Sequence, residues 1–296
     1  MTALTALAPA SWGTTYLVTT ELLPPGYPLL STVIRCLPAA LVLLVITRKL
    51  PHGSWLWRAL VLGTLNIGAF NALLFVAAYR LPGGVAATLT SVQPLLVVGL
   101  AFLLLGERPT RWRLGWGLVG VVGVGLIVLR GEVSFDLFGI VAGIAAACSM
   151  ATCVVLTRRW GRPDGVDAKA MAGWQLATGS LVLVPFALAF EGVPPTVGLP
   201  AVAGYAWLCV VGALLSYPIW FNGIATLPVV AVSFLPLLSP AVATILGWLL
   251  LGEALTPWQG LGFALALTAI TAAQLPPRSL RSSAVRAGST PNTQGE

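Results

Sequence analysis

Charged side chains are scarce in this sequence, and their scarcity excludes most soluble proteins. Asp, Glu, Lys and Arg make up 8% of the residues, whereas a soluble domain carries roughly 25%. Hydrophobic side chains account for 57%. A water-facing surface cannot be built from this composition, so we expect lipid to surround most of the chain.

The groups that catalysis or metal binding inside a membrane would require are also missing. The single histidine, His52, falls between apolar segments, and no Asp, Glu or Lys lies near the middle of one. The sequence therefore predicts that the protein is not an enzyme and has no metal site and no cofactor. Without a carboxylate in the membrane there is no evident proton relay, which favours a facilitator or a carrier coupled by other means. The cysteines lack metal-ligand spacing and are expected to pack as small side chains: Cys36, Cys148, Cys153 and Cys209.

Apolar runs, by contrast, are long and numerous. A spanning helix needs about 20 mostly apolar residues. The runs are continuous instead of alternating, which favours helices over a barrel. We predict an all-α integral membrane protein with ten transmembrane helices, over residues 2–20, 29–47, 57–79, 83–105, 112–130, 138–157, 169–190, 201–226, 229–251 and 258–275.

The basic residues are distributed unevenly between the two sides that these spans define. If the N-terminus is inside, thirteen Lys and Arg residues fall on the inner side and two, Arg80 and Arg130, on the outer side. Loops rich in Lys and Arg stay in the cytoplasm, so we expect both termini there, in a multi-pass protein of the plasma membrane. The net charge of +7 then reflects orientation, and we expect no nucleic-acid partner.

One stretch of the sequence is repeated. Residues 103–112, LLLGERPTRW, return as LLLGEALTPW at 249–258, with seven of ten positions identical and a spacing of 146 residues. We predict two repeats, residues 1–130 and 138–275, and a polar, disordered cytoplasmic tail over 276–296. Each repeat has five helices, an odd number, so the second enters the membrane from the opposite side. Inverted repeats can open a central site to each face in turn, which is alternating access.

The ends of the two matching helices have a further regularity. A proline precedes the glycine of each LLLGE by twelve residues, Pro94 before Gly106 and Pro240 before Gly252. Ten spans in two halves with this paired motif resemble the EamA-type transporters of the drug/metabolite transporter superfamily, over about residues 3–275. The resemblance implies export of small metabolites such as amino acids, from a bacterial inner membrane. It also implies a cavity lined by helices 1, 3, 4, 6, 8 and 9, and it names no single substrate.

Polar and aromatic side chains inside three spans suit a cavity wall. The segment 57–79 places Asn71, Phe75 and Tyr79 at i, i+4 and i+8, on one stripe of a helix. An amide with two aromatic rings fits an amphipathic organic ligand. Interhelical packing explains the same stripe as well, so both interpretations stay open. The spans 2–20 and 201–226 add the candidates Trp12, Thr15, Ser216, Tyr217 and Trp220.

Proline interrupts the fourth and the ninth span at matching places. A proline removes a helix hydrogen bond and leaves a carbonyl that can face a cavity. Paired interruptions of this kind indicate a transporter's binding site, although kinks that serve packing are the alternative. The candidate substrate-binding residues are Thr88, Ser91, Gln93, Ser233 and Ser239, with Pro94, Pro236 and Pro240 as the kinks.

Arg35 is the only charged residue well inside a predicted span. An ionisable group costs about 2.5–3.5 kcal/mol at the centre of a spanning helix, so such a residue usually has a specific role. Arg35 can supply a counter-charge for a substrate carboxylate. Alternatively, it snorkels or donates to backbone carbonyls between helices. The sequence does not decide between these two roles.

These observations predict a small-metabolite transporter, an exporter of amino acids or related compounds that works by alternating access. A drug or toxic-compound efflux carrier is the first alternative. A channel or a receptor-like membrane protein is the second, and saturable counterflow separates a carrier from a channel. The expected partners are a small-molecule substrate and the lipid bilayer, with the chain as a monomer or a homodimer.

Overall fold

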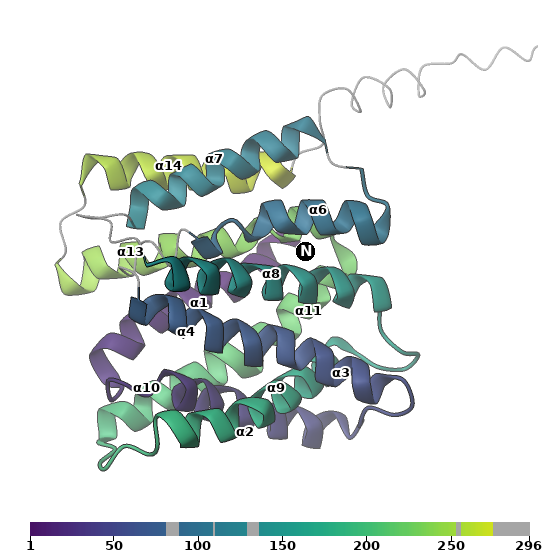
Figure 1. Ribbon diagram of the computed structural model, residues 1–296, viewed down its shortest axis with the longest axis vertical. Coiled ribbons are helices and arrows are strands. Elements are labelled where there is room, and N and C mark those ends of the chain that lie inside the picture. The colour runs from purple at the N-terminus through teal and green to yellow at the C-terminus, as the bar shows by residue number, and fades with distance from the viewer. Residues whose placement is uncertain (81–88, 109, 129–135, 253–255, 275–296) are drawn as a thin grey trace, which may run out of the picture.

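The computed structural model describes residues 1–80, 89–108, 110–128, 136–252 and 256–274. Within these ranges the regular structure is helical throughout, without a strand (Figure 1). Thr88 and the tail 276–296 lie outside the described residues, as does the side chain of Tyr79. The helices are α1 (Thr2–Leu22), α2 (Pro28–Thr47), α3 (Trp55–Gly63), η1 (Thr64–Ala69), α4 (Phe70–Arg80), α6 (Gln93–Leu105), α7 (Arg111–Val128), α8 (Leu137–Trp160), α9 (Ala168–Phe190), α10 (Leu199–Cys209), η2 (Val210–Leu215), α11 (Ser216–Thr226), α12 (Val229–Val232), η3 (Leu235–Leu237), α13 (Leu238–Leu251) and α14 (Pro257–Gln274).

The prediction of an all-helical membrane protein is confirmed at this level. Over the described residues, six helical stretches are long and apolar enough to cross a bilayer: Pro28–Thr47, Trp55–Ala77, Leu137–Trp160, Ala168–Phe190, Leu199–Thr226 and Val229–Leu250. The apolar helix Gln93–Leu105 is shorter. The arrangement as ten spans in two inverted repeats stays a prediction.

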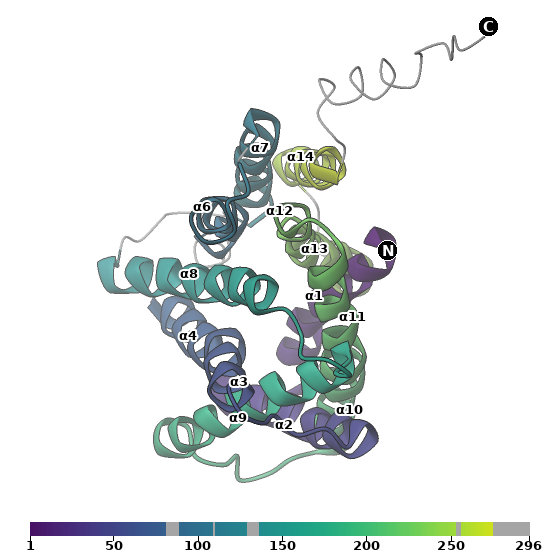
Figure 2. The same cartoon turned by 90° about the vertical axis from the view of Figure 1, so that its right-hand side faces the viewer.

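The helices run alongside one another and form a bundle with paired helices at both ends. In Figure 1, α7 and α14 lie together at the top of the view, and α2 and α9 lie together at the bottom. Between these pairs, α8 contacts α4 and α6, whereas α1 contacts α11 and α13. Figure 2 shows the group around α8 and the group around α1 on opposite sides of the molecule.

Glycine allows the closest contacts between these helices. α7 and α14 meet at Gly123, where an added Cβ would lie 2.8 Å from the backbone nitrogen of Ala266 and 2.9 Å from the carbonyl oxygen of Gly262. Small residues let helices approach closely in lipid, where no hydrophobic force drives their association. The helix backbones therefore nearly touch along this pair.

The repeated LLLGE motif forms a helix end in both of its copies. α6 ends at Leu105 and is followed by Gly106 at φ 70°, and α13 ends at Leu251 and is followed by Gly252 at φ 67°. A positive φ costs little in glycine, which is why glycine commonly follows the last residue of a helix. Gly106 and Gly252 therefore end their helices in both copies of the motif.

Aspartates precede the helices α8 and α9. Asp136 precedes α8, and its Oδ1 accepts a hydrogen bond from the Gly139 amide at 2.9 Å. Asp167 precedes α9 and accepts from Ala170 in the same way, also at 2.9 Å. Such caps satisfy amides that have no partner inside the helix. The Gly139 amide, and to a lesser extent the Arg80 guanidinium 3.3 Å away, hold the pKa of Asp136 below its ordinary value.

Two helices contain a π-helical segment at corresponding places. η1 lies between α3 and α4, and η2 lies between α10 and α11. The segments η1, α4 and α7 each begin and end 146 residues before η2, α11 and α14. This is the spacing of the repeated sequence motif, so the correspondence extends from the motif to the local geometry of the helices.

Candidate functional site

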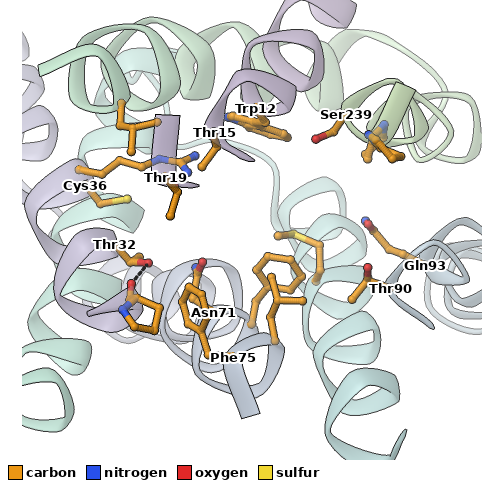
Figure 3. Close-up of a pocket in the computed structure, with 18 of the residues that line it drawn as sticks. Trp12, Thr15, Thr19, Thr32, Cys36, Asn71, Phe75, Thr90, Gln93 and Ser239 are labelled. Atoms are coloured by element: carbon orange, nitrogen blue, oxygen red, sulfur yellow. Dashed lines mark hydrogen bonds between the residues drawn. The ribbon is translucent and has the colours of Figure 1, made fainter. Parts of the chain in front are cut away.

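A cavity of about 360 Å³ lies in the middle of the bundle. Its wall takes residues from α1, α2, α4, α8, α10, α11, η3 and α13 and from the start of α6. Pockets for small molecules range over roughly 300–1,000 Å³, so this one suits a ligand of modest size. Figure 3 shows Trp12 and Thr15 on one side of the open space and Asn71 and Phe75 on another.

Most of the residues singled out in the sequence lie in this wall. The lining residues among them are Trp12, Thr15, Arg35, Asn71, Phe75, Ser91, Gln93, Pro94, Tyr217, Trp220, Pro236, Ser239 and Pro240. Residues from both halves of the chain thus meet at one cavity. Thr88 and the side chain of Tyr79 fall outside the described part of the chain.

Two of the predicted serines lie elsewhere, because each is hydrogen-bonded to its own helix. The Ser216 hydroxyl donates to the carbonyl oxygen of Val211 at 2.5 Å and shares a 2.6 Å hydrogen bond with Ser11. The Ser233 hydroxyl donates to the carbonyl oxygen of Val230 at 2.7 Å. Both serines are buried. Serine and threonine commonly make such backbone bonds inside helices, and sequence position alone does not distinguish them from residues that face a ligand.

The sequence did not single out the contribution of α2 to the wall. Ser31, Thr32 and Cys36 line the cavity together with Arg35. Positions 31 and 35, like 32 and 36, are four residues apart and therefore share a face of the helix. The polar residues Ser31 and Thr32 one turn before the arginine were the available signal. Other lining residues that sequence reasoning missed are Thr19, Thr20, Pro28, Phe70, Leu74, Thr90, Met150, Leu208 and Leu237.

An aromatic cluster forms one part of the wall. The Trp12 ring lies 5.4 Å from the Tyr217 ring and 5.4 Å from the Trp220 ring, between centroids. The Trp12 indole donates to the carbonyl oxygen of Gly212, inside η2, at 3.0 Å. That bond fixes the ring, and the three rings present a rigid apolar surface suited to a planar or aromatic group.

Arg35 fulfils part of both roles that the sequence left open. Its Nη2 donates to the carbonyl oxygen of Gly212 at 3.2 Å, so it does bond a backbone carbonyl of a neighbouring helix. The side chain also lines the cavity. No carboxylate pairs with Arg35 within the described residues, and none of the lining side chains is acidic. Among the lining residues that the structure describes, the guanidinium is therefore the only charged group.

Three buried polar atoms of the wall have no hydrogen-bond partner in the described part of the chain. They are Thr15 Oγ1, Arg35 Nε and Gln93 Nε2. Buried polar groups are almost always paired, so each of these atoms indicates a group that a ligand or water would satisfy. The arginine and glutamine atoms are donors and the threonine hydroxyl can be one, so the wall suits a ligand rich in acceptors.

The site shows no arrangement for holding a metal. Over the ranges that the structure describes, no group of three His, Cys, Asp or Glu side chains could bind a metal ion. The cavity wall combines hydroxyls, amides, aromatic rings and one guanidinium. Side chains of these kinds are typical of pockets that take organic molecules.

Comparison with known proteins agrees with this geometry. Protein PecM of Dickeya dadantii (strain 3937) is 43% identical over 267 residues, which cover 90% of either chain. The uncharacterized inner membrane transporter YedA of Escherichia coli (strain K12) is 28% identical over 275 residues, covering 88% of this chain and 87% of that protein.

A more distant relative has a name that includes its cargo. The probable terminal-alkyne amino-acid exporter of Streptantibioticus cattleyicolor (strain ATCC 35852 / DSM 46488 / JCM 4925 / NBRC 14057 / NRRL 8057) is 25% identical over 209 residues, covering 70% of this chain and 69% of that protein. A protein of known crystal structure has the same fold, with a TM-score of 0.79 at 22% identity, covering 94% of this chain and 97% of that one.

The family comparison covers nearly the whole described chain. The model of the EamA-like transporter family matches twice, over residues 2–129 and again over 137–273. Two of these relatives are named as a transporter and an exporter. The chain belongs to the EamA-like transporter family.

Proposed function

We propose that this transporter exports amino acids or related small metabolites by alternating access between two inverted five-helix repeats, residues 1–130 and 138–275. The observation that carries the proposal is the central cavity, whose wall draws residues from both repeats. A site between two halves can be exposed to either face when one half rocks against the other. The name of the terminal-alkyne amino-acid exporter supports the direction and class of cargo.

Internal symmetry of the helices supports the inverted repeat. Corresponding helices pack against each other, α7 with α14 and α2 with α9, as a two-fold axis between the repeats requires. Corresponding serines also lie beside corresponding π-helical segments of the opposite repeat. Ser149 of the second repeat donates to the carbonyl oxygen of Leu65 in η1 at 2.8 Å. Ser11 of the first repeat shares a hydrogen bond with Ser216, which itself donates to the carbonyl oxygen of Val211 in η2.

The proposed topology, with both termini in the cytoplasm, assigns the two ends of the cavity to the two membrane faces. The C-terminal end of α1 and the N-terminal ends of α2 and α6, which line the cavity, then lie toward the outside. On the inner side, Arg158 of α8 donates to the carbonyl oxygens of Ile224 and Ala225 at the end of α11. We therefore propose that the structure represents the state open to the outside, with α8 and α11 tied together at the inner face.

Efflux of drug-like compounds is the second candidate, and the aromatic cluster of Trp12, Tyr217 and Trp220 favours it. A wall of three rings suits large apolar bodies as well as amino-acid side chains. The two candidates differ in the selectivity they predict. A metabolite exporter should discriminate between small amino acids of similar size, whereas a drug carrier should accept unrelated aromatic compounds.

Counterflow in proteoliposomes tests the proposal. Vesicles loaded with unlabelled amino acids are diluted into each labelled amino acid in turn, and saturable accumulation is expected. Trp220→Leu should reduce this exchange at least tenfold because the ring forms part of the cavity wall. Trp248→Leu is the matched control, since Trp248 of α13 is half exposed on the bundle's exterior and does not line the cavity.

The possible outcomes of that experiment separate the candidates. Uptake that rises linearly with concentration and shows no counterflow contradicts a carrier and favours a channel. Saturable exchange of aromatic drugs, with none of amino acids, favours the efflux carrier. Equal loss of exchange in the Trp220 and Trp248 variants would contradict the assignment of transport to this cavity.

A further inference from the structure

We infer that the cavity selects cargo with a free carboxylate and no ammonium group, with Arg35 as the cation that pairs with the carboxylate. This inference rests on the proposed transport function but departs from its amino-acid class: among the related metabolites it names organic acids with an aromatic or planar body, and it predicts that amino acids, which carry an ammonium group, bind weakly. It follows from the charge of the wall, from the way Arg35 is held and from the donors around it.

The described residues of the wall carry a charge of +1, which comes from Arg35. None of the cavity-lining side chains carries a negative charge, and no carboxylate pairs with Arg35 in the described ranges. A guanidinium in a membrane interior attracts a negative partner strongly because the surrounding dielectric is low. An organic anion would supply that partner. An ammonium group would meet no carboxylate, and in an α-amino acid it would lie close to the guanidinium that binds the adjacent carboxylate.

The position of the guanidinium is fixed from one side only. The carbonyl oxygen of Gly212 accepts from Arg35 Nη2 at 3.2 Å and from the Trp12 indole at 3.0 Å. Gly212 lies against the guanidinium, since an added Cβ there would be in ordinary van der Waals contact with Arg35 Nε at 3.5 Å. One of the five guanidinium donors is thus used for positioning, and Nε is buried without a partner. A planar guanidinium held in this way suits a carboxylate better than the flexible ammonium group of a lysine would.

The remaining donors of the wall extend the match beyond the carboxylate. Thr15 Oγ1 and Gln93 Nε2 are also buried without partners in the described part of the chain. Figure 3 shows Thr15 and Gln93 on different sides of the space. Between them, the ring cluster that contains Trp12 presents apolar surface. A cargo with a carboxylate at Arg35, a flat apolar body and a second acceptor toward Gln93 would satisfy these groups together.

The second repeat provides a natural contrast at the corresponding place. Residues 31–44 resemble 171–184, which sets Gln175 opposite Arg35. The Gln175 side chain is fully buried and accepts a hydrogen bond from Asn66 of η1 at 3.2 Å. Gln175 lies outside the cavity wall. A glutamine therefore fits this helical position, and the charge is specific to the copy that faces the cavity.

The test compares three probes that share a phenylethyl group and differ in charge. They are 3-phenylpropionate, L-phenylalanine and 2-phenylethylamine. Binding is measured on the purified full chain in nanodiscs, with labelled 3-phenylpropionate and the other two as competitors, because weak acids cross vesicle membranes unaided. We expect 3-phenylpropionate to bind at least tenfold more tightly than phenylalanine, and 2-phenylethylamine not to compete.

Substitutions assign the preference to one side chain. Arg35→Gln, which copies the residue of the second repeat, should abolish the preference for the acid, and Arg35→Lys should retain part of it. Arg58→Gln is the control, because Arg58 stacks on the rings of Trp55, Trp57 and Trp160 outside the cavity and should leave binding unchanged. Elution as a single monodisperse species confirms that each variant is folded.

The results that would overturn the inference differ from those that would overturn transport. Competition by phenylalanine or 2-phenylethylamine equal to that of the acid contradicts charge selection, as does unchanged acid binding in Arg35→Gln. Failure of all three probes to bind at millimolar concentration also contradicts it. Acid binding that depends on Arg35, in a protein without amino-acid counterflow, would support the acid site and contradict the amino-acid cargo of the proposed function instead.

Discussion

Substitution of Gly179 by alanine tests how closely the helices are packed beside η1. A Cβ on Gly179 would meet the carbonyl oxygen of Gly63, and it would lie 2.5 Å from Ile67 Cβ and 3.0 Å from the carbonyl carbon of Gly63. Two of these neighbours are backbone atoms of α3, which cannot move aside as the end of a flexible side chain can. We expect Gly179→Ala to push α9 away from α3 and destabilise the protein.

The magnitude follows from two opposing contributions. Overpacking of a tight interior costs about 1–3 kcal/mol. Alanine in place of glycine inside a helix stabilises by about 1 kcal/mol. Gly99→Ala in α6 has the same helix-propensity gain, but its Cβ would meet nothing within 4 Å. The difference between the two variants, about 1–3 kcal/mol in the free energy of unfolding, therefore isolates the steric clash.

Unfolding by SDS titration from mixed micelles, followed by far-UV circular dichroism, gives that free energy for the wild type and both variants. Gly179→Ala should be less stable than Gly99→Ala, and Gly99→Ala should match or exceed the wild type. Equal stability of the two variants would refute the backbone contact between α3 and α9 at this point, and with it the packing described beside η1.

Three further predictions concern single hydrogen bonds. Trp12→Phe keeps a ring but removes the donor to Gly212. It should therefore lower the free energy of unfolding by about 0.5–1.5 kcal/mol in the same titration and weaken acid binding. An unchanged free energy of unfolding would contradict the assigned hydrogen bond. Ser149→Ala removes the 2.8 Å hydrogen bond to the Leu65 carbonyl and should lower the free energy of unfolding by about 1 kcal/mol. Ser149→Cys should have a smaller effect. Equal effects of the two substitutions would indicate that packing, and not the hydrogen bond, is responsible. The pKa of Asp136 is lowered from 3.8, so its stabilising effect is present above that pH and is lost as the pH falls through the lower folded-state value. Stability measured against pH should therefore decline less at the acid end in Asp136→Ala than in the wild type.

Much of the fold could be predicted because its determinants are compositional. Long apolar runs predict spanning helices, and the glycines of the LLLGE motif predict helix ends at Gly106 and Gly252. The cavity residues near the paired prolines were also found. Pro94 and Pro240 mark points where a helix hydrogen bond is lost, and this local property is visible without the structure.

The parts that escaped prediction depend on hydrogen bonds between particular atoms. The π-helical segments carry no composition that distinguishes them from an α-helix, so nothing in TLNIGA or VVGALL indicated them. Ser216 and Ser233 bond backbone carbonyls, a choice that the sequence leaves open. Ser31 and Thr32 were passed over because the family resemblance assigns the cavity to other helices.

The positions of the two π-helical segments bear on whether the insertion of a residue came before the duplication of a half-length chain. A π-helical turn, with its i to i+5 bonds, contains one residue more than an α-helical turn. Inserting a residue into an established helix rotates everything beyond it by about 100° about the helix axis, given 3.6 residues per turn. Such a change would disturb packing along a whole span. Because η1 and η2 stand 146 residues apart, at the same point of two matching helices, the simplest history is one insertion in an ancestral half-length chain, inherited by both descendants when that chain was duplicated.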